Sequence, residues 1–167
     1  MRTTFHLSGA LCATLALTAC GKSPSEKLAE AAIEASTGQK ADVDADNGQV
    51  TLKTDKGDMK VTSGDAAKLP ANFPQDVYLP AGYKVGSVME MPGAMVVDVE
   101  APGNVADTFA AATAKMTSEG WKQQMALQQT PQNQIAVYGK DNRNATLSIS
   151  EAPGKGVRIG VQLTTRQ

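Results

Sequence analysis

The sequence is poor in the side chains that most often perform catalysis. Its single histidine is His6, and its two cysteines are Cys12 and Cys20. From residue 21 onward the chain therefore has no Ser–His or Cys–His nucleophilic pair and no ligands for the common zinc sites. It also has no thiol pair there that could form a disulfide. These absences predict that the protein is not an enzyme.

A strong charge of one sign and a long apolar run are also missing. The 16 basic and 17 acidic side chains give a net charge of −1, so no strong field attracts nucleic acid. The longest apolar stretch, Leu7 to Ala19, is interrupted by polar residues and is shorter than the ~20 residues of a membrane span. The sequence therefore predicts neither a nucleic-acid-binding nor a membrane-spanning protein.

The N-terminus has the composition of an export signal. Arg2 precedes the Leu- and Ala-rich stretch from Leu7 to Ala19, which ends in Leu17-Thr18-Ala19-Cys20. This ending resembles the lipobox of bacterial lipoproteins, in which small residues precede a cysteine. The resemblance implies that residues 1–19 are a signal peptide that is removed, and that Cys20 becomes the acylated N-terminus. Stable anchoring takes two or more acyl chains, so a triacylated Cys20 would tether the protein to a membrane, facing the periplasm.

The residues after Cys20 bear on which membrane holds the anchor. Gly21 stands where the family's usual inner-membrane retention signal has Asp, and this favours the outer membrane. However, Gly21-Lys22-Ser23 also resembles a retention signal of pseudomonad-type lipoproteins. We expect the outer membrane, with the inner membrane as the alternative.

The mature chain divides into four parts. After the anchor, Ser23 and Glu26 form a capping-box pattern, which predicts a short helix from Pro24 to Ser36 within residues 20–38. Residues 39–64 alternate apolar and polar side chains around an Asn47-Gly48 turn, which predicts a small β-meander. Residues 65–82 contain three prolines among apolar residues, and we interpret them as an extended linker laid along the next domain.

Residues 83–167 have the pattern of an α+β domain. Two strands (84–91 and 95–100) precede a helix that begins after Asn104 and ends at Gly120-Trp121. Strands at 122–129, 134–140, 145–151 and 157–163 follow. Short links between them predict a ββαββββ antiparallel sheet with one helix packed on it. We expect the single tryptophan, Trp121, to close the helix in the core; if exposed, it could anchor a partner.

The pattern as a whole resembles a set of uncharacterised small bacterial envelope lipoproteins. The residues that carry this resemblance are the Asp42-Val43-Asp44 and Asn47-Gly48 hairpin, Leu69-Pro70, Phe73 to Val77, and Gly120-Trp121. The resemblance implies a fold and a compartment, but no activity.

Three groups of residues suggest a ligand site. Met89, Met91 and Met95 could bind Cu(I) through their thioethers, although methionine also fills gaps in cores. The carboxylates of Asp42, Asp44 and Asp46 suggest a calcium loop, but Asn47 and Lys53 stand where an EF-hand needs Gly and Glu. The Asp98 and Glu100 pair could serve acid–base chemistry, or could form the solvated face of a strand.

These observations lead to two hypotheses for the function. The first is a lipid-anchored, non-enzymatic interaction module that binds a protein partner in the cell envelope. The second is a periplasmic ligand-binding protein, for Cu(I) or for a small apolar molecule held between helix and sheet. No cofactor is predicted.

Overall fold

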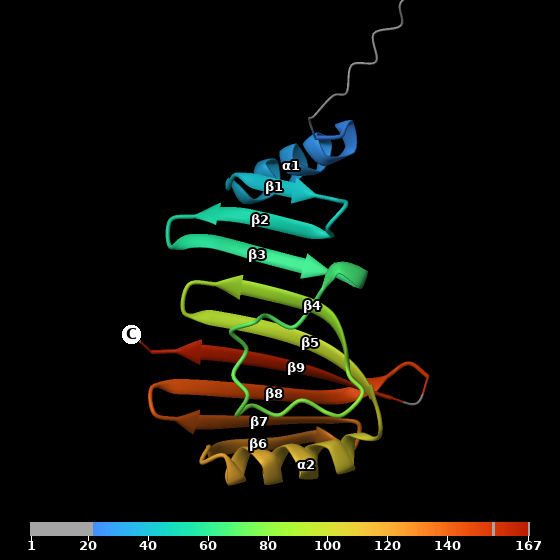
Figure 1. Ribbon diagram of the computed structural model, residues 1–167, viewed down its shortest axis with the longest axis vertical. Coiled ribbons are helices and arrows are strands. Elements are labelled where there is room, and N and C mark those ends of the chain that lie inside the picture. The colour runs from blue at the N-terminus through green and yellow to red at the C-terminus, as the bar shows by residue number, and fades with distance from the viewer. Residues whose placement is uncertain (1–21, 155, 167) are drawn as a thin grey trace, which may run out of the picture.

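The protein is an α+β structure built on one antiparallel sheet. The computed structural model describes residues 22–154 and 156–166, so the predicted signal peptide and Cys20 lie outside the described residues. Within that part of the chain, two α-helices accompany a nine-stranded sheet, with strand order β1-β2-β3-β4-β5-β9-β8-β7-β6 (Figure 1). This confirms the predicted class, an antiparallel sheet with a helix packed on it.

The helices and strands begin and end near the turn and capping residues of the sequence. The helices are α1 (Pro24–Thr37) and α2 (Val105–Ser118), and a short 3-10 turn, η1, spans Gly64–Ala66. The strands are β1 (Ala41–Asp44), β2 (Gln49–Thr54), β3 (Gly57–Ser63), β4 (Lys84–Met91), β5 (Ala94–Pro102), β6 (Lys122–Thr130), β7 (Asn133–Lys140), β8 (Arg143–Ala152) and β9 (Gly156–Thr165).

The predicted meander and the predicted C-terminal sheet join into one sheet. β3 pairs with β4 from Lys60↔Glu90 to Ser63↔Ser87, so the six ββαββββ strands do not form a sheet of their own. The physical reason lies in the strand edges. A three-stranded meander and the edge of β4 would each leave a row of unpaired backbone groups, and the β3–β4 ladder satisfies both rows.

The core lies on one face of the C-terminal strands. Val97 and Val99 of β5, Ile159 and Val161 of β9, and Leu147 and Ile149 of β8 alternate with polar residues and are almost completely buried. On this face α2 contributes Ala112 and Met116, which are also buried. Its side chains at i, i+4, i+7 and i+11 form the apolar stripe that packs on the sheet.

Both ends of α2 are fixed by local hydrogen bonds. The Asn104 side chain accepts from the Asp107 amide at 2.9 Å, which caps the first turn. At the other end Gly120 has φ of 85°, and the Trp121 amide donates to the Met116 carbonyl at 3.0 Å. This is the Schellman closure, and it directs the Trp121 side chain into the core, where it is 2% exposed.

The segment between β3 and β4 crosses the sheet on the same face as α2. Figure 1 shows residues 67–83, the crossing segment, passing in front of β5, β9 and β8. Its Phe73 and Val77 are buried in the core, with Leu69, Tyr78 and Leu79 packed around them. Contrary to the prediction from the sequence, the segment is not extended throughout: the Phe73 amide donates to the Pro70 carbonyl at 3.0 Å and the Val77 amide to the Pro74 carbonyl at 3.3 Å. Each bond closes a tight turn that an extended chain cannot make, so the segment crosses the strands as a series of turns.

Candidate functional site

The structure separates the three methionines that the sequence suggested as a copper site. In the β4–β5 hairpin Met89 is opposite Val96, Met91 is opposite Ala94, and Met95 is opposite Glu90. Side chains alternate between the two faces of a strand. Met95 therefore lies on the core face, where it is 8% exposed, whereas Met89 and Met91 lie on the other face and are half-buried.

A different methionine shares the face of Met89 and Met91. Val61 of β3 is opposite Met89, and Lys60 is opposite Glu90, so the same register places Met59 beside Met91. The Cβ of an alanine at Gly57 would lie 2.6 Å from the Pro92 Cγ, which shows how closely the start of β3 approaches the β4–β5 turn. Met59 could not be identified from the sequence, because only strand pairing relates it to Met91.

These methionines belong to a larger apolar surface on the face of the sheet opposite α2. One row of side chains crosses five strands in register, Val43↔Val50↔Val61↔Met89↔Val96, and it ends where Val96 meets Gln162 of β9. All of its members are half-buried. We call this surface the apolar face; it consists of Ala41, Val43, Val50, Leu52, Met59, Val61, Met89, Met91, Ala94 and Val96.

The opposite side of the first three strands is polar. Asp42 and Asp44 of β1, Thr51 of β2, and Lys60 and Thr62 of β3 point to that side, by the same alternation. The meander therefore turns its apolar side chains away from the face that carries the core. Large exposed apolar patches are features of interaction surfaces and ligand-binding grooves.

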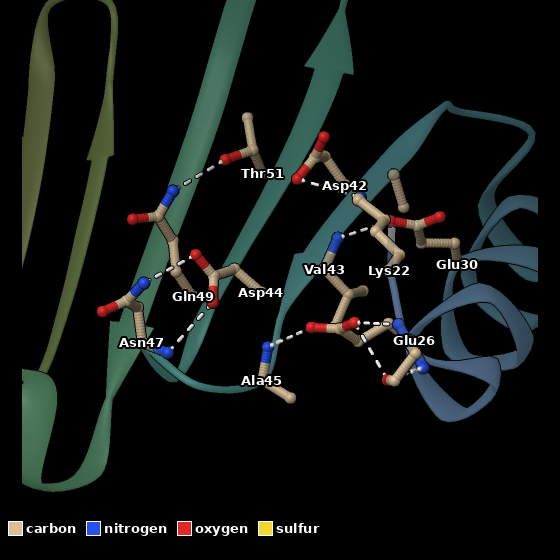
Figure 2. Close-up of polar contacts among 12 residues, drawn as sticks. Lys22, Glu26, Glu30, Asp42, Val43, Asp44, Ala45, Asn47, Gln49 and Thr51 are labelled. Atoms are coloured by element: carbon tan, nitrogen blue, oxygen red, sulfur yellow. Dashed lines mark hydrogen bonds and ion pairs between the residues drawn. The ribbon is translucent and has the colours of Figure 1, made fainter. Parts of the chain in front are cut away.

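Helix α1 covers the outer edge of β1 with three carboxylates. The amides of Ala45, Val43 and Ala41 donate to Glu26 Oε1 at 2.9 Å, to Glu30 Oε1 at 2.8 Å and to Glu34 Oε1 at 3.2 Å. Figure 2 shows the Glu26 and Glu30 contacts. These are the outward amides of an edge strand, the groups through which a foreign strand would pair.

The three carboxylates match the β1 edge because the spacing of the glutamates along α1 is close to the spacing of the outward amides along β1. Successive glutamates are four residues apart on the helix, a rise of about 6 Å. The outward amides are two residues apart on the strand, about 6.6 Å. The helix runs antiparallel to β1, so Glu26 meets the end of the strand and Glu34 meets its start. The capping box formed by Ser23 and Glu26 fixes the start of this helix.

The contacts shift the acid–base properties of this cluster. The hydrogen bond from the Ala45 amide, with those from Ser23, lowers the pKa of Glu26. The Lys22 ammonium and then the Val43 amide lower the pKa of Glu30. The Glu30 carboxylate in turn raises the pKa of Lys22, which also lies 3.1 Å from Asp42 Oδ1. Both glutamates are therefore ionised acceptors at neutral pH.

The other predicted sites do not converge on a ligand. Asp42 pairs with Lys22, and Asp44 accepts from the amide and the side chain of Asn47 at 3.0 and 2.8 Å, so the two carboxylates serve local contacts. Asp98 accepts from the Ser87 hydroxyl at 3.0 Å, while Glu100 pairs with Arg158 at 2.6 Å. Glu100 therefore lies on a solvated strand face, which is the alternative to acid–base chemistry that the sequence offered for Asp98 and Glu100.

The part of the chain that the structure describes has neither a cluster of metal-binding side chains nor a membrane-spanning helix. No group of three or more histidine, cysteine, aspartate or glutamate side chains there is arranged to hold a metal ion. Residues 22–154 and 156–166 also contain no helix that is both long and apolar enough to cross a membrane.

A groove opens between the crossing segment and α2. Its volume is about 440 Å³, and it is lined by Leu69, Phe73, Val77, Tyr78 and Leu79, with Lys115 of α2 at its rim. Its lining comes from the crossing segment and α2 and includes no strand residue, so it differs from the site between helix and sheet that the apolar-ligand hypothesis expected.

Comparison with known proteins adds no relative. No protein family, curated protein or solved structure matches the chain.

Proposed function

We propose that this protein is a lipid-anchored, non-enzymatic interaction module of the bacterial cell envelope. It is tethered through Cys20, faces the periplasm, and binds a protein partner on the apolar face. The anchor belongs to the outer membrane in this proposal, because Gly21 replaces the Asp of the usual retention signal.

In this proposal the two halves of the sheet have different roles. The ββαββββ part, β4 to β9 with α2, is the stable body of the protein. The short N-terminal helix α1 and strands β1 to β3 extend from this body toward the anchor, since α1 begins only four residues after Cys20.

The observation that carries the proposal is the apolar face itself. It is continuous across five strands, strands β1 to β3 carry no charged side chain on this side of the sheet, and its members keep part of their surface in contact with solvent. Asp98 of β5 borders it beside Val96. Neither α2 nor the crossing segment packs on it, because both cover the other face. Placing such a surface beside a membrane tether is the arrangement expected of a module that holds a partner near the bilayer.

The test uses adjacent residues of β2 that point to opposite faces. A photo-crosslinking residue replaces Val50 or Leu52 on the apolar face, or Thr51 between them on the polar face, in full-length protein in intact cells. We expect a protein adduct of one defined mass from positions 50 and 52, and none from position 51. Adducts with lipid alone, or equal adducts from all three positions, would contradict the proposal.

A second candidate function follows from Met59, Met89 and Met91. Three neutral thioethers on one uncharged surface match the preference of Cu(I) for soft ligands, and neither His nor Cys is required. Met59 lies beside Met91 by register, and Met89 lies two residues along the same strand.

The matched control for copper is Met95, which lies on the core face of the same hairpin. Cu(I) is titrated against bicinchoninate with the protein, with a Met59/Met89/Met91→Leu triple variant, and with Met95→Leu. We expect the triple variant to fail to withdraw Cu(I) from bicinchoninate, and Met95→Leu to withdraw it as well as the unsubstituted protein does. Equal competition by all three proteins would end this candidate without affecting the crosslinking test.

A further inference from the structure

The two edges of the sheet are protected differently. The edge of β1 is covered by α1 through the three glutamates, whereas β6, at the other end of the strand order, pairs with β7 alone among residues 22–154 and 156–166. The side chains of β6 from Lys122 to Gln128, and that of Thr130, are all exposed. Helix α2 packs over β6, β7 and β8, and in the part of the chain that the structure describes no strand pairs with the outer side of β6.

The open edge also lacks the charge that normally protects an edge strand. No charged residue occurs between Lys122 and Lys140, a stretch that includes nearly all of β6 and β7. Natural edge strands usually carry lysine, proline or bulges that prevent pairing with another chain. β6 has register shifts between Gln123 and Met125 and between Gln128 and Thr130, but the run Met125–Gln128 between them pairs regularly with β7.

This regular run presents exposed apolar side chains. Met125 and Leu127 are 47% and 46% exposed and point to the same face, beside Val137 and Ile135 of β7. Ala126 between them points to the other face and is exposed too. A pair of large apolar residues held half in water at a free edge is stabilised when a second strand covers it.

We propose that β6 pairs antiparallel with β6 of a second copy of this chain, with the two-fold axis at Ala126. In this register Ala126 faces its own copy, and Met125 of each chain faces Leu127 of the other. The two sheets continue into one, and the four large apolar side chains form a single cluster on one face. The pairing and the sedimentation test do not depend on the proposed function, whereas the disulfide test requires the oxidising compartment that the proposed function assigns.

Self-complementarity favours a second copy over an unrelated strand. When a strand pairs with its own copy about a two-fold axis, two charged positions related by that axis place the same charge on both sides. Like charges placed opposite each other destabilise the pair. β6 avoids this, since Lys122 is opposite the uncharged Thr130 and the residues between them carry no charge.

The first test is the mass of the full chain in detergent, measured by sedimentation across a range of concentrations. We expect a dimer for the unsubstituted protein and a monomer for Ala126→Lys, which places two lysines opposite each other at the axis. Gln132→Lys adds the same charge in the exposed β6–β7 turn and should remain dimeric. The Ala126→Lys side chain is solvent-exposed, so an unchanged circular dichroism spectrum verifies its fold.

The second test reads the register by disulfide formation in intact cells. Directly opposite residues in a sheet have Cα atoms about 4.5–5.5 Å apart, within the range that a disulfide spans. Ala126→Cys should give an oxidised dimer alone, and Met125→Cys should give one with co-expressed Leu127→Cys. Lys53→Cys, exposed on β2, serves as the control and should give none. A monomer at all concentrations, a dimer that survives Ala126→Lys, or crosslinking of the Ala126→Cys variant only to a different protein would overturn the proposal.

Discussion

The indole Nε1 of Trp121 donates a 2.9 Å hydrogen bond to the backbone carbonyl of Asp76, forty-five residues earlier in the chain. The Asp76 carboxylate accepts from Arg143 at 2.7 and 3.1 Å and from Lys140 at 2.7 Å. The Arg143 guanidinium also lies 4.9 Å from the centre of the Trp121 ring. One residue of the crossing segment is therefore fixed to the end of α2 and to strands β7 and β8.

We first predict that Asp76→Asn reduces stability in a pH-dependent way. The Arg143 guanidinium, with Lys140, lowers the pKa of the Asp76 carboxyl to about 2. A carboxyl whose folded pKa lies about two units below its unfolded value contributes about 2–3 kcal/mol above pH ~4, and this contribution is lost as the pH falls toward ~2. Urea unfolding should show this loss at pH 7, and the two proteins should converge near pH 2.

The control for Asp76→Asn is Asp46→Asn, in an exposed turn of the meander. It should leave the free energy of unfolding at pH 7 nearly unchanged, because a solvated surface carboxylate contributes little. If both variants lose the same stability, or if the loss in Asp76→Asn persists at pH 2, the ion pairs of Asp76 do not stabilise the fold as described.

We next predict that Trp121→Phe destabilises the protein by about 2–3 kcal/mol. The substitution leaves a cavity in the core and removes the donor to the Asp76 carbonyl, which is then left without its partner. Thermal unfolding followed by circular dichroism measures the change. Tyr83→Phe removes one polar atom from a half-buried aromatic residue at the end of the same crossing segment and should cost much less. Equal losses would mean that the Trp121 contact is not specific.

The order of elements was largely predictable from the sequence, because turn and capping residues mark where helices and strands end. Asn47-Gly48, Asn104 and Gly120 all act where their chemistry indicated. Alternation also showed which side chains share a face within a strand, except in β4, where a register shift interrupts it.

Pairing between strands was not predictable, and the candidate sites depended on it. The register shift between Val85 and Ser87 places Val85 and Val88, three residues apart, on the same face of β4. The apolar side chains of the meander point away from the core face of the later strands, which no single strand reveals. For the same reason the sequence grouped Met95 with Met89 and Met91, whereas the register selects Met59.

We also predict that the cover of the β1 edge is removed by acid or by loss of a glutamate. Glu30→Ala frees the Val43 amide, and Glu26→Ala frees the Ala45 amide. Each amide should then exchange its hydrogen faster in a residue-resolved exchange experiment. Because the pKa values of Glu26 and Glu30 are lowered, the protection is present at neutral pH and is lost as the pH falls below the usual value of about 4.3. Glu119→Ala, at the end of α2, should leave both amides unchanged.

Finally, two glycines with positive φ should differ in their tolerance of alanine. Gly38 ends α1 with φ of 71°, and a Cβ there would meet no atom within 4 Å. Gly38→Ala should therefore cost only the left-handed backbone penalty, about 1–2 kcal/mol. Gly48, in the Asn-Gly turn, has φ of 56°, and a Cβ there would lie 2.5 Å from the Ser63 carbonyl oxygen.

Gly48→Ala must therefore move the backbone as well as strain it, because the atom in the way is a carbonyl oxygen and not a flexible side-chain end. It also disturbs the hydrogen bond from the Ser63 amide to the Gly48 carbonyl, at 3.0 Å, which holds this turn to the end of β3. We expect it to cost clearly more than Gly38→Ala in urea unfolding and to raise hydrogen exchange across β1 to β3. Equal costs for the two variants would show that the turn can shift without breaking the meander.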